Sequence, residues 1–386
     1  MVALGDTIGC LDGKGSSMSA LVVPLRRVRI ENFRGVRALE LALDPEVTVI
    51  FGGNAGGKTT LLDAVAVLLG EVVRLFLPEA DVRRLRRRED LRRPALTSAE
   101  FGEQARQERP YVYVEAHGEG ASWGVCQTRS AADRAPAGAL GVEGLLEALR
   151  PTILAAHQGD VEALIPVFVS YGTERSVVQV PLRERDFAQS VGRLDALDGA
   201  LQAQTHFKSV FEWFRVMQEL ENKRKIDLED LDYQLPALRQ VKLALERSGL
   251  RCANPRLELA PPRLMVDFMR ADGVSEALDI VQLSDGFRTH LALLMDLARR
   301  MVQANPSDDV DAPERGINSR AVVLIDEVDL HLEAAWQGEV LAGLRRAFPA
   351  AQFVVSTHSE QVIASVRADQ VRHVSFANGE IVLEAA

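Results

Sequence analysis

Cysteine, lysine and membrane-length apolar runs are all scarce in this sequence of 386 residues. Its three cysteines, Cys10, Cys126 and Cys252, stand far apart and form no CxxC pair. This spacing argues against a disulfide framework or a cysteine zinc site, and it favours a reducing compartment. A membrane span needs about 18 consecutive apolar residues, and no apolar run here approaches that length. No secretory signal is visible at the start of the sequence. We therefore expect a cytoplasmic protein that makes no membrane contact.

Positive charge is also in the minority, because the formal net charge is −10. That balance argues against a protein that coats nucleic acid by bulk attraction. Arginines nevertheless cluster between Arg83 and Arg93. This segment is a candidate contact for nucleic-acid phosphate, and the alternative is a solvated helix in an arginine-rich chain. Only six lysines occur among the 45 basic residues, which makes Lys58 conspicuous.

Hydrophobic periodicity predicts an α/β fold. Apolar and polar residues alternate from 25 to 50, which predicts two or three strands with a turn at Arg34-Gly35. Later apolar runs alternate with helical stretches, so we expect a mixed or parallel sheet core, N-terminal antiparallel strands and an inserted helical subdomain. The expected helices are 58–77, 201–248, 287–303, 333–348 and 360–366, and the expected later strands are 111–118, 122–128, 165–172, 264–268, 280–283, 321–325 and 352–358, with a closing hairpin at Asn378-Gly379.

The segment Gly52–Thr60 reads GGNAGGKTT and matches the pattern GxxxxGK[ST]. It follows an apolar strand and opens a helix, a context that favours a phosphate-binding loop over a chance glycine-rich turn. Glycines let the backbone wrap a phosphate chain so that amide groups and a helix N-terminus face it. Lys58 would reach the β- and γ-phosphates, and the Thr59 hydroxyl would hold Mg²⁺. The residues expected to bind the nucleotide are Gly52, Asn54, Ala55, Gly56, Gly57, Lys58, Thr59 and Thr60.

Two later apolar strands end in residues suited to the same chemistry. AVVLI is followed by Asp326 and Glu327. One carboxylate there can hold Mg²⁺, and its neighbour can polarise an attacking water. QFVVST is followed by His358, which can hydrogen-bond a γ-phosphate as a neutral imidazole. Each residue alone could simply end a strand, but together with the glycine loop they favour catalytic roles for Glu327, His358 and Lys58.

A fourth segment, LSDGF, places Ser284 and Gly286 directly before an apolar helix. Ser284 could do no more than cap that helix. The same residue types also build an anion site from a hydroxyl, a glycine amide and a helix N-terminus. Both interpretations stay open at this point.

In this order, the four segments resemble the Walker A, signature, Walker B and switch-histidine motifs of ABC-type ATPases. The resemblance implies a head-to-tail dimer that holds two ATP molecules between its subunits. It also implies that the segment Asp329–His331 crosses the interface and that residues 171–175 are equivalent to the family's Q-loop. The residues carried over are Lys58, Thr59, Asp326, Glu327 and His358 for the nucleotide of their own subunit, and Ser284 and Gly286 for that of the partner.

The opening VRIENFRGVRALELAL resembles the RecF/SMC/OLD branch of that family, in which Asn32, Phe33 and Arg34 would lie near the nucleotide. IDEVDLHLEAAWQ resembles the same branch, although Glu333-Ala334 stands where His-Pro is usual. The signature reads LSDG where transporters carry LSGGQ. From about residue 25 the chain is similar to compact stand-alone ATPases of anti-phage systems, of the PtuA type found in Septu and retrons.

These resemblances imply an ATPase that uses ATP and Mg²⁺, forms a homodimer or higher assembly, and acts as a switch for a separate effector. That effector would be an HNH-type nuclease or retron components. A RecF-like repair ATPase acting on DNA ends or gaps, and an ATP-gated clamp with little turnover, are the alternatives. The helix from Phe207 to Arg224 is either core or a docking surface.

The expected organisation is a single ATPase domain over 21–386, after a disordered N-terminus over 1–20 in which Met18 is an alternative start. Within the domain we expect an N-terminal lobe (21–165), a helical insertion with the signature (166–305) and a C-terminal lobe (306–386).

Overall fold

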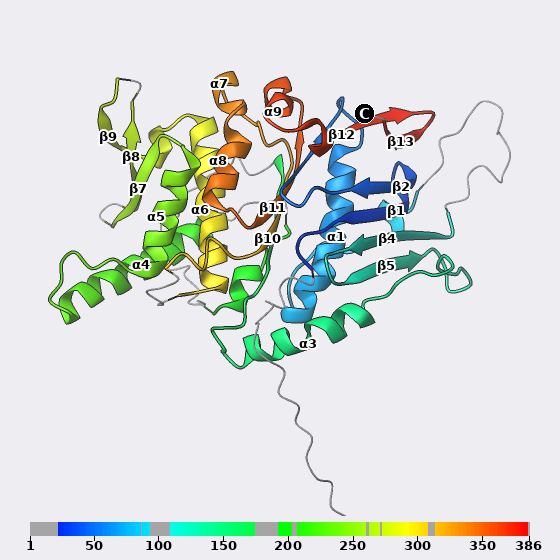
Figure 1. Cartoon of the computed structure of the whole chain (residues 1–386), viewed down its shortest axis with the longest axis horizontal. Helices are drawn as coiled ribbons and strands as arrows, with labels where there is room; N and C mark the ends of the chain where they lie inside the picture. Colours follow the sequence, from blue (N-terminus) through cyan, green and yellow to red (C-terminus); the bar gives the residue numbers. More distant parts are fainter. Residues whose placement is uncertain are drawn as a thin grey trace, which may run out of the picture.

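The computed structural model describes residues 22–85, 87–92, 109–173, 192–202, 207–259, 262–270, 272–307 and 313–384. Within these ranges the strands form three sheets, of six, four and three strands. Figure 1 shows the four-stranded sheet on one side of helix α1 and a group of helices on the other side of the central sheet. The predicted α/β class, with a mixed core sheet and N-terminal antiparallel strands, is confirmed. The predicted N-terminal segment 1–20 lies outside the described residues.

The six-stranded sheet is the core that carries three of the four motifs. Its strand order is β13-β12-β3-β11-β10-β6. The neighbours β12, β3, β11, β10 and β6 pair in parallel, whereas β13 turns back antiparallel to β12. Strands β10 and β11 are buried at every position because both faces of the sheet are covered. The bounds are β3 Val47–Phe51, β6 Val167–Tyr171, β10 Ala321–Ile325, β11 Ala351–Thr357, β12 Val371–Ala377 and β13 Glu380–Leu383.

The four-stranded sheet is antiparallel and has the order β2-β1-β4-β5. In β1, Val28 and Ile30 point into the core while Arg27 and Arg29 face outward, as the alternating sequence predicts. The turn between β1 and β2 places Asn32 and Arg34 at φ 54° and 49°. The bounds are β1 Arg27–Phe33, β2 Val36–Ala42, β4 Tyr111–His117 and β5 Ser122–Thr128.

Helix α1 (Lys58–Phe76) packs between these two sheets and contacts both β11 and β4 (Figure 1). Its apolar residues are buried around most of its circumference, which is expected of a helix covered on two sides. The indole N–H of Trp123 donates to the Leu68 carbonyl at 3.0 Å and ties β5 to the helix. The middle of α1 is thereby tied to the four-stranded sheet.

The other face of the central sheet is covered by α6, and α5 packs against both α6 and α8 (Figure 1). A three-stranded antiparallel sheet, β7-β8-β9, lies in the same half of the molecule. The remaining bounds are α2 Arg87–Asp90, α3 Glu143–His157, α4 Phe207–Asp227, α5 Pro236–Ser248, β7 Cys252–Leu259, β8 Pro262–Met269, β9 Ser275–Asp279, α6 Asp285–Ala304, α7 Ala334–Gln337, α8 Val340–Ala347 and α9 Glu360–Ala364.

The prediction of a strand over 280–283 is wrong, because the chain forms a 3₁₀ turn over Ile280–Gln282. The Asp279 carboxylate accepts from the Val281 N–H at 3.2 Å, and the Gln282 side chain accepts from the Asp279 N–H at 2.8 Å. This reciprocal cap ends β9 and turns the chain toward α6. The apolar run that suggested a strand is therefore a connection between β9 and the signature segment at the start of α6.

Two predicted helices are each divided in the structure. The stretch 201–248 gives α4 and α5, and Pro236 starts the second of them. The stretch 333–348 gives α7 and α8. The apolar face of α4 is core, since Val210, Phe211 and Phe214 are buried.

The segment 166–305 is more than a helical insertion. It contributes β6 to the central sheet and contains the whole three-stranded sheet. Helix α3 was not predicted, because its sequence follows a Gly/Ala-rich stretch and contains Pro151. Among the described residues, no helix is long and apolar enough to cross a membrane.

Candidate functional site

The glycine-rich loop connects β3 to α1 and ends in two left-handed positions, Ala55 at φ 58° and Gly57 at φ 101°. A left-handed conformation costs glycine little, which explains a glycine at the position just before the helix. Gly52 meets a second restriction, because a Cβ atom there would lie 2.0 Å from the Val374 carbonyl oxygen of β12. The loop and β12 can approach this closely only without a side chain at Gly52.

Lys58 is only 6% exposed, and its ammonium group is held by the loop. It donates to the carbonyl oxygens of Gly52 at 2.9 Å and Gly53 at 3.1 Å. Its Nζ lies 2.8 Å from His358 Nε2, which as acceptor must carry its ring proton on Nδ1. Burial lowers the pKa of Lys58, and the negative charges of Asp326, Glu327 and Asp329 oppose that shift.

Thr59 and Asp326 lie together, although 267 positions separate them. The Thr59 hydroxyl donates to Asp326 Oδ2 at 2.7 Å. The other Asp326 oxygen accepts from the Ser356 hydroxyl, and the Asp326 N–H donates to the Tyr171 carbonyl at 2.8 Å. A hydroxyl beside a carboxylate is the hard oxygen pair that Mg²⁺ prefers, with phosphate and water completing its shell. The donor set therefore fits Mg²⁺.

A dedicated protein cage for a metal is not needed for this fit. Among the described residues, no group of three or more His, Cys, Asp or Glu side chains is arranged to hold a metal ion. Mg²⁺ bound beside a phosphate chain commonly uses one or two protein oxygens and keeps several waters.

Glu327 follows the metal-ligand candidate directly and adopts φ 50°. Non-glycine residues rarely take this left-handed conformation, which is found most often where surrounding structure fixes it. Here the Glu327 N–H donates to the Ser356 hydroxyl at 2.8 Å, and the next residue, Val328, donates to the Ser356 carbonyl at 2.9 Å. Ser356 of β11 thus binds the carboxylate of Asp326 and the backbone of Glu327.

These side chains converge on a cavity of about 260 Å³ at the carboxyl edge of the central sheet. The cavity joins the β3–α1 loop to the ends of β10 and β11 and to the hairpin β12–β13. Phe376 and Ile381 of that hairpin were not predicted to line the site. The lining residues are Asn54, Ala55, Gly56, Gly57, Lys58, Thr59, Thr60, Asp326, Glu327, His358, Phe376 and Ile381.

Asn32 and Arg34 are not among the lining residues. The Arg34 guanidinium donates to Asp63 at 2.6 Å and to Asp90 at 3.0 Å, and the Asn32 carbonyl accepts from the Arg92 N–H at 3.0 Å. Their turn reaches the cavity only indirectly, because the carbonyl of Gly35 accepts from the Ile381 N–H at 2.9 Å.

The arginine-rich segment is partly neutralised by the same contacts. Arg83 lies 3.3 Å from Asp63, and Arg92 lies 3.1 Å from Glu380. The side chains of Arg86, Arg87 and Arg88 and residue Arg93 lie outside the described residues.

Ser284 and Gly286 stand at the start of α6 and do not line the cavity of their own chain. Ser284 occupies the N-cap position and is exposed, yet its side chain makes no capping hydrogen bond. Gly286 is buried, and a Cβ atom there would lie 2.3 Å from the His331 carbonyl oxygen. The signature segment therefore lies directly against the segment Asp329–His331.

Tyr171, the last residue of β6, connects the site to α6. Its carbonyl binds the Asp326 N–H, and its hydroxyl donates to Asp296 Oδ2 at 3.0 Å. Residues 174 and 175 of the proposed Q-loop equivalent lie outside the described residues.

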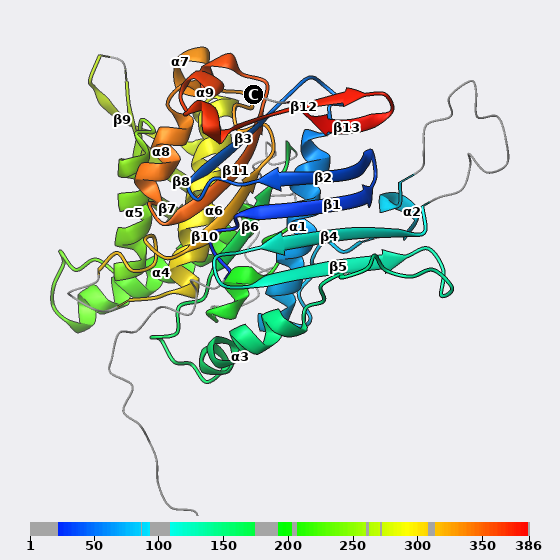
Figure 2. The ribbon, with the colours of Figure 1, turned by 45° about the vertical axis from the view of Figure 1, so that its right-hand side comes forward.

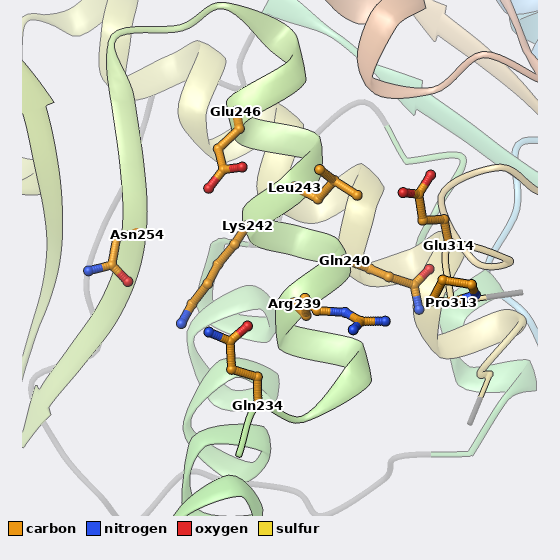
Figure 3. Close-up of a pocket in the computed structure, with 9 residues that line it drawn as sticks. All are labelled: Gln234, Arg239, Gln240, Lys242, Leu243, Glu246, Asn254, Pro313 and Glu314. Atoms are coloured by element: carbon orange, nitrogen blue, oxygen red, sulfur yellow. The ribbon is translucent and has the colours of Figure 1, made fainter. Parts of the chain in front are cut away.

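A larger cavity, of about 490 Å³, lies away from these motifs (Figure 3). Figure 3 shows that its side chains come from α5, from Gln234 just before that helix, from β7 and from residues 313 and 314. It combines the basic Arg239 and Lys242 with the acidic Glu246 and Glu314, and it holds none of the motif residues. Size alone does not identify the functional site here, because the donors suited to phosphate and Mg²⁺ all lie at the smaller cavity.

Comparison with known families gives matches along most of the chain. A family model described as AAA domain matches residues 27–246. A second AAA domain model, whose description also mentions the AbiEii toxin of type IV toxin–antitoxin systems, matches residues 214–364.

Three curated relatives carry related names. The Retron Vc95 probable ATPase of Vibrio cholerae is 27% identical over 252 residues, 54% of this chain and 47% of that protein. The Retron Ec83 probable ATPase of Escherichia coli is 24% identical over 409 residues, 89% of this chain and 70% of that protein. The Septu protein PtuA of Bacillus mycoides is 40% identical over 77 residues, 20% of this chain and 10% of that protein.

The chain thus spans about half the length of the Vibrio cholerae relative. The predicted resemblance to retron and Septu ATPases is confirmed by these three matches. Among solved structures, the SMC head bound to the C-terminal winged-helix domain of ScpA aligns with a TM-score of 0.47 at 15% identity, covering 94% of this chain and 97% of that one.

Proposed function

Because the chain belongs to the AAA domain family, we propose that it binds ATP with Mg²⁺ at the cavity of the β3–α1 loop and hydrolyses it to ADP and phosphate. One observation carries the proposal. The Thr59 hydroxyl lies 2.7 Å from the Asp326 carboxylate, at the cavity that Lys58 and Glu327 also line. A phosphate-binding loop, a hard-cation pair and a carboxylate base meet there although they come from both ends of the sequence.

Each residue has a distinct part in this reaction. Lys58 offsets the charge of the β- and γ-phosphates, and Thr59 and Asp326 hold Mg²⁺, which when bound neutralises phosphate charge. Glu327 takes a proton from the water whose oxygen attacks the γ-phosphorus, while the bond from that phosphorus to the bridging oxygen breaks and ADP leaves. His358, beside Lys58 Nζ at 2.8 Å, orients the γ-phosphate.

Two copies of the chain would complete the site. Ser284 is exposed and does not line its own chain's cavity, which supports an action of Ser284 and Gly286 on the nucleotide of a partner copy. The contact of Gly286 with His331 supports a common interface for the signature and the segment Asp329–His331. Binding of ATP would close such a head-to-tail dimer, and hydrolysis would reopen it.

In the cell, this cycle would act as a switch for a separate effector in anti-phage defence, with an HNH-type nuclease or retron components as the partner class. The names of the relatives, two retron ATPases and a Septu protein, support this part of the proposal. A RecF-like role is distinguished by its response to DNA, since it requires ATP turnover that DNA ends or gaps stimulate.

The test compares ATP binding and turnover of the wild type, Glu327→Gln and the control Glu246→Gln. Glu246 is an exposed carboxylate on α5, outside the candidate site. We expect Glu327→Gln to bind ATP normally and to lose turnover by about 100-fold or more, as removal of a general base does. The control should match the wild type. Equal turnover in all three proteins would remove Glu327 from the mechanism, and no ATP binding by the wild type would end the proposal.

A further inference from the structure

The cavity has a catalytic end and an end without catalytic groups, and the strand order defines both. Strands β10 and β11, which end at Asp326, Glu327 and His358, lie on one side of β3. Strand β12 lies on the other side of β3 and runs parallel to it. Phe376 near the end of β12 therefore lines the cavity across the glycine loop from the γ-phosphate residues.

The hairpin that carries Phe376 is fixed to the loop. Ile381, the cross-strand partner of Phe376, is only 5% exposed. It packs so closely on the loop that a Cβ atom at Gly57 would lie 2.4 Å from its side chain, and its N–H donates to the Gly35 carbonyl at 2.9 Å. On β12, the Val374 carbonyl sits against Gly52. Figure 2 shows the hairpin beside β2 and above the N-terminal sheet.

Phe376 itself is 56% exposed, unlike its partner. One edge of its ring is backed by the β1–β2 turn, since its Cε2 would lie 3.6 Å from a Cβ atom at Gly35. A large, half-exposed aromatic ring at the wall of a phosphate-binding cavity offers a π-face to a ligand.

From this geometry we infer that Phe376 is the stacking platform for the base of the bound nucleotide. The inference rests on the proposed function, because the γ-phosphate must lie toward Glu327 and His358. The phosphate chain then leads away from them across β3, and its base arrives on the side of the hairpin. Bases stack on aromatic side chains, and such stacking is tolerant of base identity since every base has a π-face.

The platform should therefore contribute affinity without selecting one purine. Phenylalanine has no donor or acceptor with which to read the base edge. ATP and GTP should both gain affinity from Phe376, and inorganic triphosphate, which has no base, should gain none.

The experiment measures binding of ATP, GTP and inorganic triphosphate, each with Mg²⁺, to the full chain and its variants. We expect Phe376→Ala to bind ATP and GTP about tenfold more weakly, and triphosphate as the wild type does. Phe376→Trp should restore nucleotide affinity. The control Val382→Ala shortens the neighbour of Ile381 on β13, which does not line the cavity, and should leave all three affinities unchanged.

Unchanged ATP affinity in Phe376→Ala would overturn the inference. So would a parallel loss of triphosphate affinity, which would mean that the ring only supports the loop. A loss that appears only when two copies associate would identify Phe376 as a contact between copies instead. If the wild type binds neither ATP nor triphosphate, the proposed function fails first and the inference falls with it.

Discussion

At the scale of single residues, glycine determines how closely backbone segments approach each other around the cavity. Gly52 allows the Val374 carbonyl of β12 to rest on the loop, and Gly286 allows the His331 carbonyl to rest on the start of α6. In both places the neighbour is backbone, which cannot move aside as a flexible side chain would. These two glycines are therefore structural parts of the candidate site.

Gly286→Ala should uncouple turnover from nucleotide binding. The new methyl group would lie 2.3 Å from the His331 carbonyl oxygen and would displace either that segment or the start of α6. We expect a loss of about 1–3 kcal/mol of folding free energy and a larger loss of turnover, with ATP affinity of the single chain preserved. Thermal unfolding and ATPase assays measure both quantities.

Gly338→Ala is the matched control for that variant. Gly338 has an ordinary helical φ of −68°, and nothing lies within 4 Å of a Cβ atom there. Its substitution should be neutral or slightly stabilising. Equal stability and equal turnover of Gly286→Ala and Gly338→Ala would mean that the contact of Gly286 with His331 is not needed for function.

Ser356→Ala tests the residue that binds both the Asp326 carboxylate and the Glu327 backbone. The Ser356 hydroxyl donates to Asp326 and accepts the Glu327 N–H at 2.8 Å. Without it, the N–H loses its acceptor and Glu327 loses the bond that holds its left-handed backbone. We expect turnover to fall at least about tenfold and the Mg²⁺ concentration for half-maximal rate to rise, because both carboxylates are misplaced. Ser375→Ala, at a serine of β12 that does not line the cavity, should change neither value.

At the scale of elements, α6 is fastened to the core by a buried ionic cluster. Asp296 accepts from Tyr171 at 3.0 Å, from Arg299 at 2.7 Å and from Arg300 at 2.9 Å. Arg300 also donates to the carbonyls of Ala196 and Asp198. Since the Tyr171 carbonyl binds the Asp326 N–H, this cluster sets the position of the signature helix relative to the metal-ligand candidate.

Asp296→Asn should be strongly destabilising. Burial alone would raise the pKa of Asp296, but the guanidinium groups of Arg300 and Arg299 outweigh it and lower that pKa to about 2. Removing the charge leaves two buried cations without their counterion, which costs about 3–5 kcal/mol. Urea unfolding at pH 7 measures the loss, and Asp285→Asn, at an exposed position of the same helix, is the control.

The same cluster predicts a direction of pH dependence. The folded-state pKa of Asp296 lies below the ordinary value of 3.8, so its contribution to stability is complete above pH 3.8 and is lost as the pH falls toward 2. The difference in the free energy of unfolding between the wild type and Asp296→Asn should therefore shrink as the pH falls from 3.8 toward 2. A difference in the free energy of unfolding that stays constant from about pH 5 to about pH 3 would contradict the lowered pKa of Asp296.

Most of the candidate site could be predicted, because the GxxxxGK[ST] loop and the strand-end residues Asp326, Glu327 and His358 can each be recognised from a few neighbouring residues in the sequence. The place of Phe376 in the cavity wall could not be recognised from its neighbours in the sequence. The Asn378-Gly379 turn predicted a hairpin, but only the pairing of β12 with β3 places that hairpin over the loop. The 3₁₀ turn at Ile280–Gln282 was likewise decided by the Asp279 cap, against an apolar run that resembles a strand.

At the scale of the whole molecule, the proposal of a second copy rests on the position of Ser284. It is exposed at the start of α6 and does not line its own cavity, whereas Gly286 beside it packs on the segment Asp329–His331. If that surface faces the loop of a partner, the two cavities of a dimer are each built from both chains.

Ser284→Arg should block closure without touching the loop. We expect turnover to be abolished while the single chain keeps its ATP affinity, because a bulky cation would replace the hydroxyl that faces the partner in the proposed dimer. Binding and ATPase assays on the same preparation separate the two effects. If affinity falls as far as turnover, Ser284 serves its own chain and the shared-site account is wrong.

The most direct measurement is ATPase activity after mixing Lys58→Met with Ser284→Arg. Each variant alone should be inactive, the first because its loop cannot hold the phosphates and the second because it cannot complete a partner's site. A mixed dimer contains one cavity with an intact Lys58 from one chain and an intact Ser284 from the other, so the mixture should regain turnover well above the sum of its components. Turnover in the mixture no higher than that sum, with both proteins folded and associated, would contradict the account.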